Sequence, residues 1–136
     1  MKTFVTFLLS IITFLGFSQT TSLEKEVYNV INNYKIKLNK NSVSLSDTLS
    51  KQSKEHTKFM IKNNKLEHAE FINARGEIIQ KTNEIGVTDK ETAENILNCF
   101  LNSKPHKGII EMKFTSIGVG IVTDSEGFNW ITIRFV

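Results

Sequence analysis

The chain has 136 residues with 17 basic and 14 acidic side chains, a formal net charge of +3, and one cysteine. The basic residues are spread among acidic ones, which excludes the clustered basic surface of a nucleic-acid-binding protein. A single cysteine excludes an internal disulfide. Because Cys99 lies in an apolar helical run, we expect it to be a small buried side chain and not a catalytic thiol.

Residues 1–18 have the pattern of a cleavable secretion signal. An early lysine is followed by an apolar stretch over 4–15, and small residues at positions 16 and 18 suit a cut before Gln19. The apolar stretch is about a dozen residues, shorter than the roughly 20 that span a bilayer. We therefore expect a secreted or periplasmic protein without a membrane span after cleavage. Removing 18 of the 136 residues leaves 118, numbered 19–136, which suffices for one domain and not for two.

The first half of that domain predicts two amphipathic helices. Apolar residues at helical spacing predict a helix over 22–38, with acidic residues near its start and lysines near its end, as the helix dipole favours. A second helix over 46–63 begins at a serine cap and carries His56 on its apolar face. We expect His56 to be buried and hydrogen-bonded, with a place in a cleft as the alternative. Residues 64–76 look irregular and carry His68.

The second half begins with a predicted strand and a third helix. An apolar run over 77–80 favours a short strand, and a Thr-x-x-Glu capping box starts a helix at Thr88. This helix must end near Ser103, because Pro105 disfavours helical backbone at the residue before it.

The end of the chain predicts a β-hairpin. Two alternating runs within 117–135 are joined by four turn residues. Gly118 and Gly120 share one face of the first run, where a helix can approach closely. The order of elements fits an α+β fold in which helices cover a small antiparallel sheet.

Three side chains outside the apolar stripes could carry chemistry: His68, Glu77 and His106. Two imidazoles and a carboxylate suit a divalent transition metal, above all zinc. The three residues lack the i, i+4 spacing of a helical zinc motif, and solvated or capping histidines are the alternative. Ser103 lies three residues before His106 and could form a nucleophile–base pair with it, although the sequence offers no evident oxyanion hole or third orienting acid.

Several blocks, in this order and spacing, resemble the bacterial SCP-like form of the CAP superfamily (cysteine-rich secretory proteins, antigen 5 and pathogenesis-related-1). They are L-x-x-x-S-x-x-H-x-x-x-M over 49–60 with His68 after it, G-E-I-I over 76–79, F-L-N-S-K-P-H over 100–106, I-G-V-G over 117–120 and W-I-T-x-x-F over 130–135. Phe100 stands where the family usually has Trp. The resemblance covers roughly residues 24–136.

The resemblance implies a three-layer α-β-α sandwich with a shallow cleft, in which two His and two Glu can hold a divalent ion. Carried across residue by residue, the histidines are His68 and His106, and the first glutamate is Glu77, with Glu84 as the alternative. The second glutamate of the family falls at Ser103, so the tetrad is incomplete in this chain.

A fold alone does not settle function. Our leading hypothesis is a secreted binding domain that is not an enzyme, whose cleft holds zinc, another divalent ion, or a small polar or lipidic ligand. One alternative is a hydrolase, either metal-assisted or using Ser103 with His106. Another is a cell-surface interaction module with a protein partner and a vestigial cleft.

Overall fold

The structure is a computed structural model that describes residues 19–70 and 73–136. The expected secretion signal, residues 1–18, lies outside the described residues and stays a prediction. In the described part of the chain, no helix is both long enough and apolar enough to cross a membrane.

Within these residues the chain forms four helices and four strands. The helices are α1 (Ser22–Lys37), α2 (Asp47–Asn63), α3 (Asp89–Leu101) and α4 (Lys104–Glu111), and the strands are β1 (Ser44–Leu45), β2 (Gly76–Thr82), β3 (Ser116–Thr123) and β4 (Asn129–Phe135). Side-chain oxygens of Thr21, Ser46 and Thr88 accept hydrogen bonds from backbone N–H groups in the first turns of α1, α2 and α3. The predicted start of the third helix at Thr88 is thereby confirmed.

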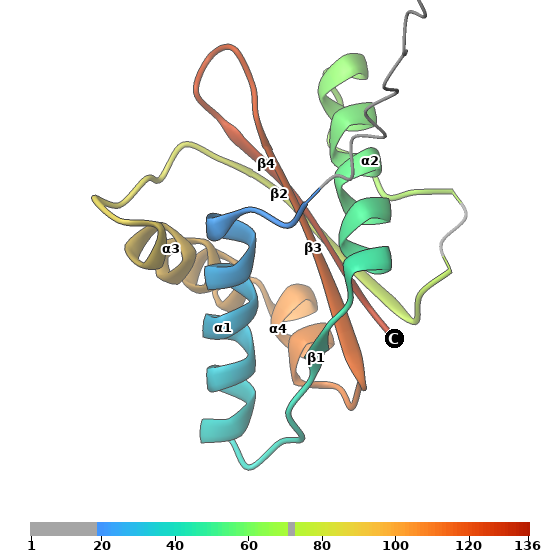
Figure 1. Ribbon diagram of the computed structural model, residues 1–136, viewed down its shortest axis with the longest axis vertical. Coiled ribbons are helices and arrows are strands. Elements are labelled where there is room, and N and C mark those ends of the chain that lie inside the picture. The colour runs from blue at the N-terminus through green and yellow to red at the C-terminus, as the bar shows by residue number, and fades with distance from the viewer. Residues whose placement is uncertain (1–18, 71–72) are drawn as a thin grey trace, which may run out of the picture.

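The strands form one sheet in the order β1-β3-β4-β2, between two layers of helices. Helix α2 covers one face, and α1, α3 and α4 cover the other (Figure 1). The chain is therefore an α+β protein with α-β-α layers, as predicted. One expectation was wrong: β1 pairs with β3 in parallel, so the sheet is mixed and not wholly antiparallel. A two-residue strand in a polar stretch is too short to show an alternating pattern.

Most of the hydrophobic core lies between the sheet and the three-helix layer, where Ile78 of β2 is fully buried. A smaller cluster under α2 joins Met60, Ile79 and Trp130. Because successive side chains of a strand point to opposite faces, Glu77 lies on the α2 face together with Ile79. This alternation decides which layer each candidate site residue can reach.

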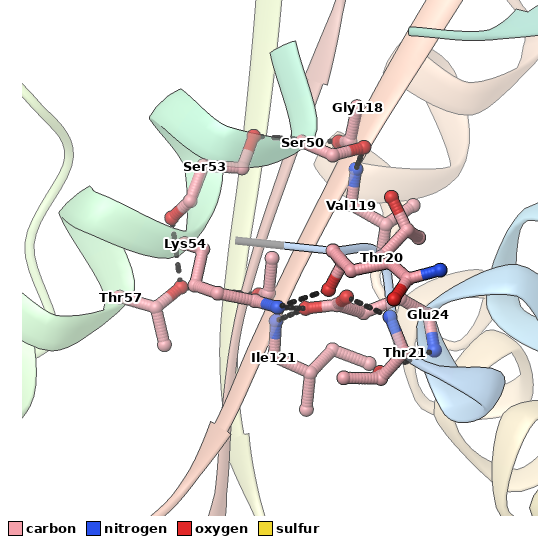
Figure 2. Close-up of polar contacts among 12 residues, drawn as sticks. Thr20, Thr21, Glu24, Ser50, Ser53, Lys54, Thr57, Gly118, Val119 and Ile121 are labelled. Atoms are coloured by element: carbon pink, nitrogen blue, oxygen red, sulfur yellow. Dashed lines mark hydrogen bonds and ion pairs between the residues drawn. The ribbon is translucent and has the colours of Figure 1, made fainter. Parts of the chain in front are cut away.

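Helix α2 lies directly on β3 because two glycines leave room for it. A Cβ atom on Gly118 would come within 2.3 Å of Leu49, and one on Gly120 within 2.1 Å of the backbone nitrogen of Lys54. Along the same contact, Oγ of Ser53 donates to the carbonyl oxygen of Gly118 at 3.4 Å (Figure 2). The close approach predicted at the two glycines is confirmed.

Pro105 begins a helix as well as following one. Helix α3 ends at Leu101, and α4 begins at Lys104 with Pro105 in its first turn. Proline is tolerated there because N–H groups of the first turn have no acceptor within the helix. His106 therefore lies in the first turn of α4, a helix that the sequence pattern did not predict.

A buried lysine ties the end of α1 to the end of α4. Lys35 is fully buried, and its Nζ donates to the carbonyl oxygens of Ile110 at 2.7 Å and Met112 at 2.6 Å. Burial lowers the pKa of Lys35, and the nearby charge of Lys40 lowers it further. The place of Lys35 in the last turn of α1 predicts an interaction with the dipole of its own helix, whereas Lys35 stabilises the last carbonyls of another helix.

Candidate functional site

His68 is held by Glu77 at the start of β2. The Nδ1 atom of His68 lies 2.9 Å from Oε1 of Glu77, and the backbone N–H of Ala69 donates to the same oxygen at 3.1 Å. Because a carboxylate is an acceptor, the neutral form of His68 holds its proton on Nδ1, which leaves the lone pair of Nε2 free. The side chain of His68 is 59% exposed, so a ligand can reach it.

Arg134 fixes Glu77 from β4, where the two residues are paired across the sheet. The Nε–H of Arg134 donates to Oε2 of Glu77 at 2.9 Å, and the side chains are only 8% and 2% exposed. Burial alone would raise the pKa of Glu77, but hydrogen bonds from Arg134, His68 and the Ala69 backbone outweigh it and hold the pKa below its ordinary value. Glu77 is therefore a carboxylate at neutral pH that positions the imidazole of His68.

An open groove of about 560 Å³ lies beside His68, and it is lined by His56, Phe59, Glu67, His68, Ala69 and Glu70. Nε2 of His56 lies 2.8 Å from the carbonyl oxygen of Glu67, which attaches the segment after α2 to the helix. His56 is buried and hydrogen-bonded, as predicted, and it also lines the groove. Phe59 is 51% exposed and stacks on His56, so the groove has an apolar wall.

His106 lies in the first turn of α4, in the helical layer opposite α2. Its ring packs edge-on against Phe100, with the ring centroids 5.2 Å apart. Burial lowers the pKa of His106, and the charge of His68 lowers it further. His106 is therefore neutral at pH 7 with a lone pair available. It is not among the side chains that line the groove beside His68.

The other predicted site residues lie apart from this cluster. Glu84 follows the far end of β2, where its Oε2 accepts a hydrogen bond from Sγ of Cys99 at 3.5 Å. Cys99 is half-buried and not fully buried as expected, because it lies beside the apolar face of α3 and not on it. Ser103 is the N-cap of α4 without a side-chain capping bond, and within the described residues no hydrogen bond joins it to His106.

The donor set decides how well a metal ion would fit. In the ranges 19–70 and 73–136, no group of three or more His, Cys, Asp or Glu side chains is placed to hold one. Both carboxylate oxygens of Glu77 already accept hydrogen bonds, so Glu77 has the position of a partner that orients a histidine. The nitrogens of His68 and His106 remain, fewer than the three protein ligands of a typical catalytic zinc site.

Sequence reasoning missed Arg134, although Arg134 holds Glu77 in place. A signal was present, because Arg134 stands between Ile133 and Phe135 in an otherwise apolar strand. A charged side chain in such a strand needs a partner when it is buried. The partner could not be identified without the register of β2 against β4.

The family model of the cysteine-rich secretory protein family, CAP, matches residues 28–135. No protein with a curated description matches the sequence.

Solved structures with the same fold include three proteins of low sequence identity. An outer surface protein from Borrelia burgdorferi has a TM-score of 0.71 at 23% identity, over 86% of this chain and 93% of that chain. An extracellular protein containing an SCP domain from Bacillus anthracis strain Ames has a TM-score of 0.61 at 16% identity, over 82% of this chain and 40% of that one. Hookworm platelet inhibitor has a TM-score of 0.51 at 11% identity, over 84% and 66%. At these identities the likeness shows the fold alone, and this chain spans less than half of the Bacillus protein.

Proposed function

This chain belongs to the CAP family, the cysteine-rich secretory protein family, and from that membership we propose that it is a secreted or surface-located binding module and not an enzyme. Export is supported by the signal pattern over 1–18. It is also supported by two structural relatives described as an outer surface protein and an extracellular protein. The mass of the protein recovered outside the cytoplasm tests cleavage before Gln19.

The observation that carries the binding proposal is the arrangement of His68. The buried pair of Glu77 and Arg134 holds an exposed imidazole in one orientation beside a groove. A buried ion pair often stabilises a fold no more than an apolar pair of the same volume. Orienting the histidine therefore explains this pair better than stability does.

The groove favours a ligand with a hydrogen-bond donor and an apolar part. Nε2 of His68 accepts a hydrogen bond from a hydroxyl or amino group, and the exposed ring of Phe59 contacts the apolar part. Glu67 and Glu70 also line the groove. Their negative charges disfavour an anionic ligand.

We also propose a divalent ion such as zinc as a second class of ligand. His68 and His106 would hold it, and Glu77 would orient His68 through Nδ1. When bound, the ion would supply an electrophilic attachment point for a ligand oxygen. With two protein nitrogens, affinity depends on the water or ligand oxygens that complete the coordination.

Calorimetric titration of zinc into residues 19–136 tests the metal part. We expect weak binding by the wild type and none by a His68→Ala/His106→Ala double variant. Glu84→Gln is the matched control, because Glu84 lies past the other end of β2. Undiminished binding by the double variant, or binding lost in Glu84→Gln, would contradict this assignment. Turnover of peptide or ester substrates that disappears in His106→Ala would contradict the non-enzymatic part.

A further inference from the structure

The segment just before α1 is held against the domain by hydrogen bonds. Nζ of Lys54, on α2, donates to the backbone carbonyl oxygen of Gln19 at 3.4 Å. Two residues later the N–H of Thr21, the N-cap of α1, donates to Oε2 of Glu24 at 2.7 Å. Gln19 itself is exposed. Its backbone is therefore attached beside a lysine, while the surrounding solvent leaves its side chain free to turn.

The charges beside Gln19 form a closed set. Glu24 is fully buried, and its Oε1 lies 3.0 Å from Nζ of Lys54 (Figure 2). The same oxygen accepts a hydrogen bond from the N–H of Ile121 at 2.9 Å, and Oε2 accepts the one from Thr21. Both oxygens of Glu24 are thus occupied, so this carboxylate compensates Lys54 and has no oxygen left for a second cation.

Cleavage before Gln19 would add a second cation at this place, and the inference therefore rests on the export proposed above. The new α-ammonium group would belong to the residue whose carbonyl binds Lys54, close to the positive end of the α1 dipole. Both charges favour the neutral amine over the ammonium form. Asp47, which accepts a hydrogen bond from Thr20 at 3.4 Å, is exposed and offsets them little.

We propose that Gln19, once it is the first residue of the mature chain, closes into pyroglutamate. The neutral α-amine attacks Cδ of its own side-chain amide, and the new N–Cδ bond completes a five-membered lactam. The bond between Cδ and Nε2 breaks, and a proton of the amine moves to Nε2, which leaves as ammonia. The step needs no oxidant, reductant or second substrate, and it removes the unpaired positive charge.

The closed ring has a consequence for the start of α1. An aminopeptidase needs a free α-amine, and the lactam has none. Degradation from this end would next remove Thr20 and then Thr21, whose side chain caps α1. The modification thus protects the capping box, and with it the local environment of the buried Glu24, in a protein exposed to proteases outside the cell.

The intact mass of the wild-type protein recovered outside the cytoplasm tests the proposal. We expect the mass of residues 19–136 less one ammonia. Gln19→Asn is the matched control, because its shorter side chain would have to close a four-membered ring, and this variant should keep its full mass. A chain that begins at Gln19 with its full mass overturns the ring but not export. A chain that begins at another residue overturns the ring together with the expected cleavage site.

The rate of ring closure tests the role assigned to the neighbouring charges. Residues 19–136 with a free amine are obtained by cutting a leader directly before Gln19, and the loss of ammonia is followed by mass at neutral pH. We expect the folded protein to cyclise several-fold faster than the same protein unfolded in guanidinium chloride. High salt should slow the folded protein, because it screens the charges. Equal rates in the folded and unfolded protein, or no effect of salt, would overturn that role.

Discussion

Replacing Glu77 by glutamine removes the charge that compensates Arg134 while keeping the size of the side chain. Both side chains are almost completely buried, so water cannot replace the lost charge. Removing one partner of a buried ion pair costs about 3–5 kcal/mol. That is a large part of the free energy of unfolding of a small domain, about 5–15 kcal/mol.

Thermal unfolding followed by circular dichroism measures the effect. We expect Glu77→Gln to unfold roughly 10–20 °C below the wild type. The double variant Glu77→Leu/Arg134→Met should recover most of this loss, because neither buried charge remains. A fall of less than about 1 kcal/mol in the free energy of unfolding of Glu77→Gln, well below the range for a broken buried pair, would refute this expectation. So would a double variant whose loss of stability equals the sum of the losses in Glu77→Leu and Arg134→Met.

The same carboxylate predicts how stability depends on pH. The pKa of Glu77 in the folded protein lies below its ordinary value. The carboxylate therefore makes its full contribution to stability above the pKa of the unfolded state, about 4.3. The contribution is lost as the pH falls through the lower folded value. The wild type should therefore lose stability in acid more steeply than Glu77→Gln, and equal slopes would contradict the assigned shift.

Three further predictions concern other parts of the molecule. Gly120→Ala forces α2 away from β3 and should lower the free energy of unfolding, measured in urea, by about 1–3 kcal/mol or more. Gly108→Ala has open space around the new Cβ and should not lower the free energy of unfolding. Lys35→Met leaves the carbonyls of Ile110 and Met112 without a donor and should cost about 1–3 kcal/mol; a more stable variant would count against the buried contact. By NMR titration, His106 should have a pKa below its ordinary value that rises in His68→Ala, since only the effect of burial then remains; no rise would mean that the two imidazoles do not interact.

Much of the fold could be predicted because its causes are local. The Thr88 cap acts on residues a few positions away, and Gly118 and Gly120 recur on one face of a single strand. Patterns of such short range are visible in a sequence. Pro105 shows the limit, because the same proline favours the end of one helix and the first turn of the next.

The candidate site could be predicted only in part, because its interactions join distant residues. The pairing of His68 with Glu77 spans nine positions, whereas that of Glu77 with Arg134 spans 57. Glu24 has the same property: its role in the capping box of α1 is local, but its bond to Ile121 spans 97 positions. Such partners follow from the register of the sheet, and the sequence does not state that register.

Strand β4 lies in the middle of the sheet although it is the last element of the chain. Strands β2 and β3 do not touch each other, and each is joined to the sheet through β4. When the N-terminal end emerges first, from a ribosome or from a membrane channel, the helices have no complete surface to pack on until β4 arrives. Closing such long loops is slow. This connectivity delays folding until β4 has emerged, which would suit the proposed export of the chain across a membrane in an extended form.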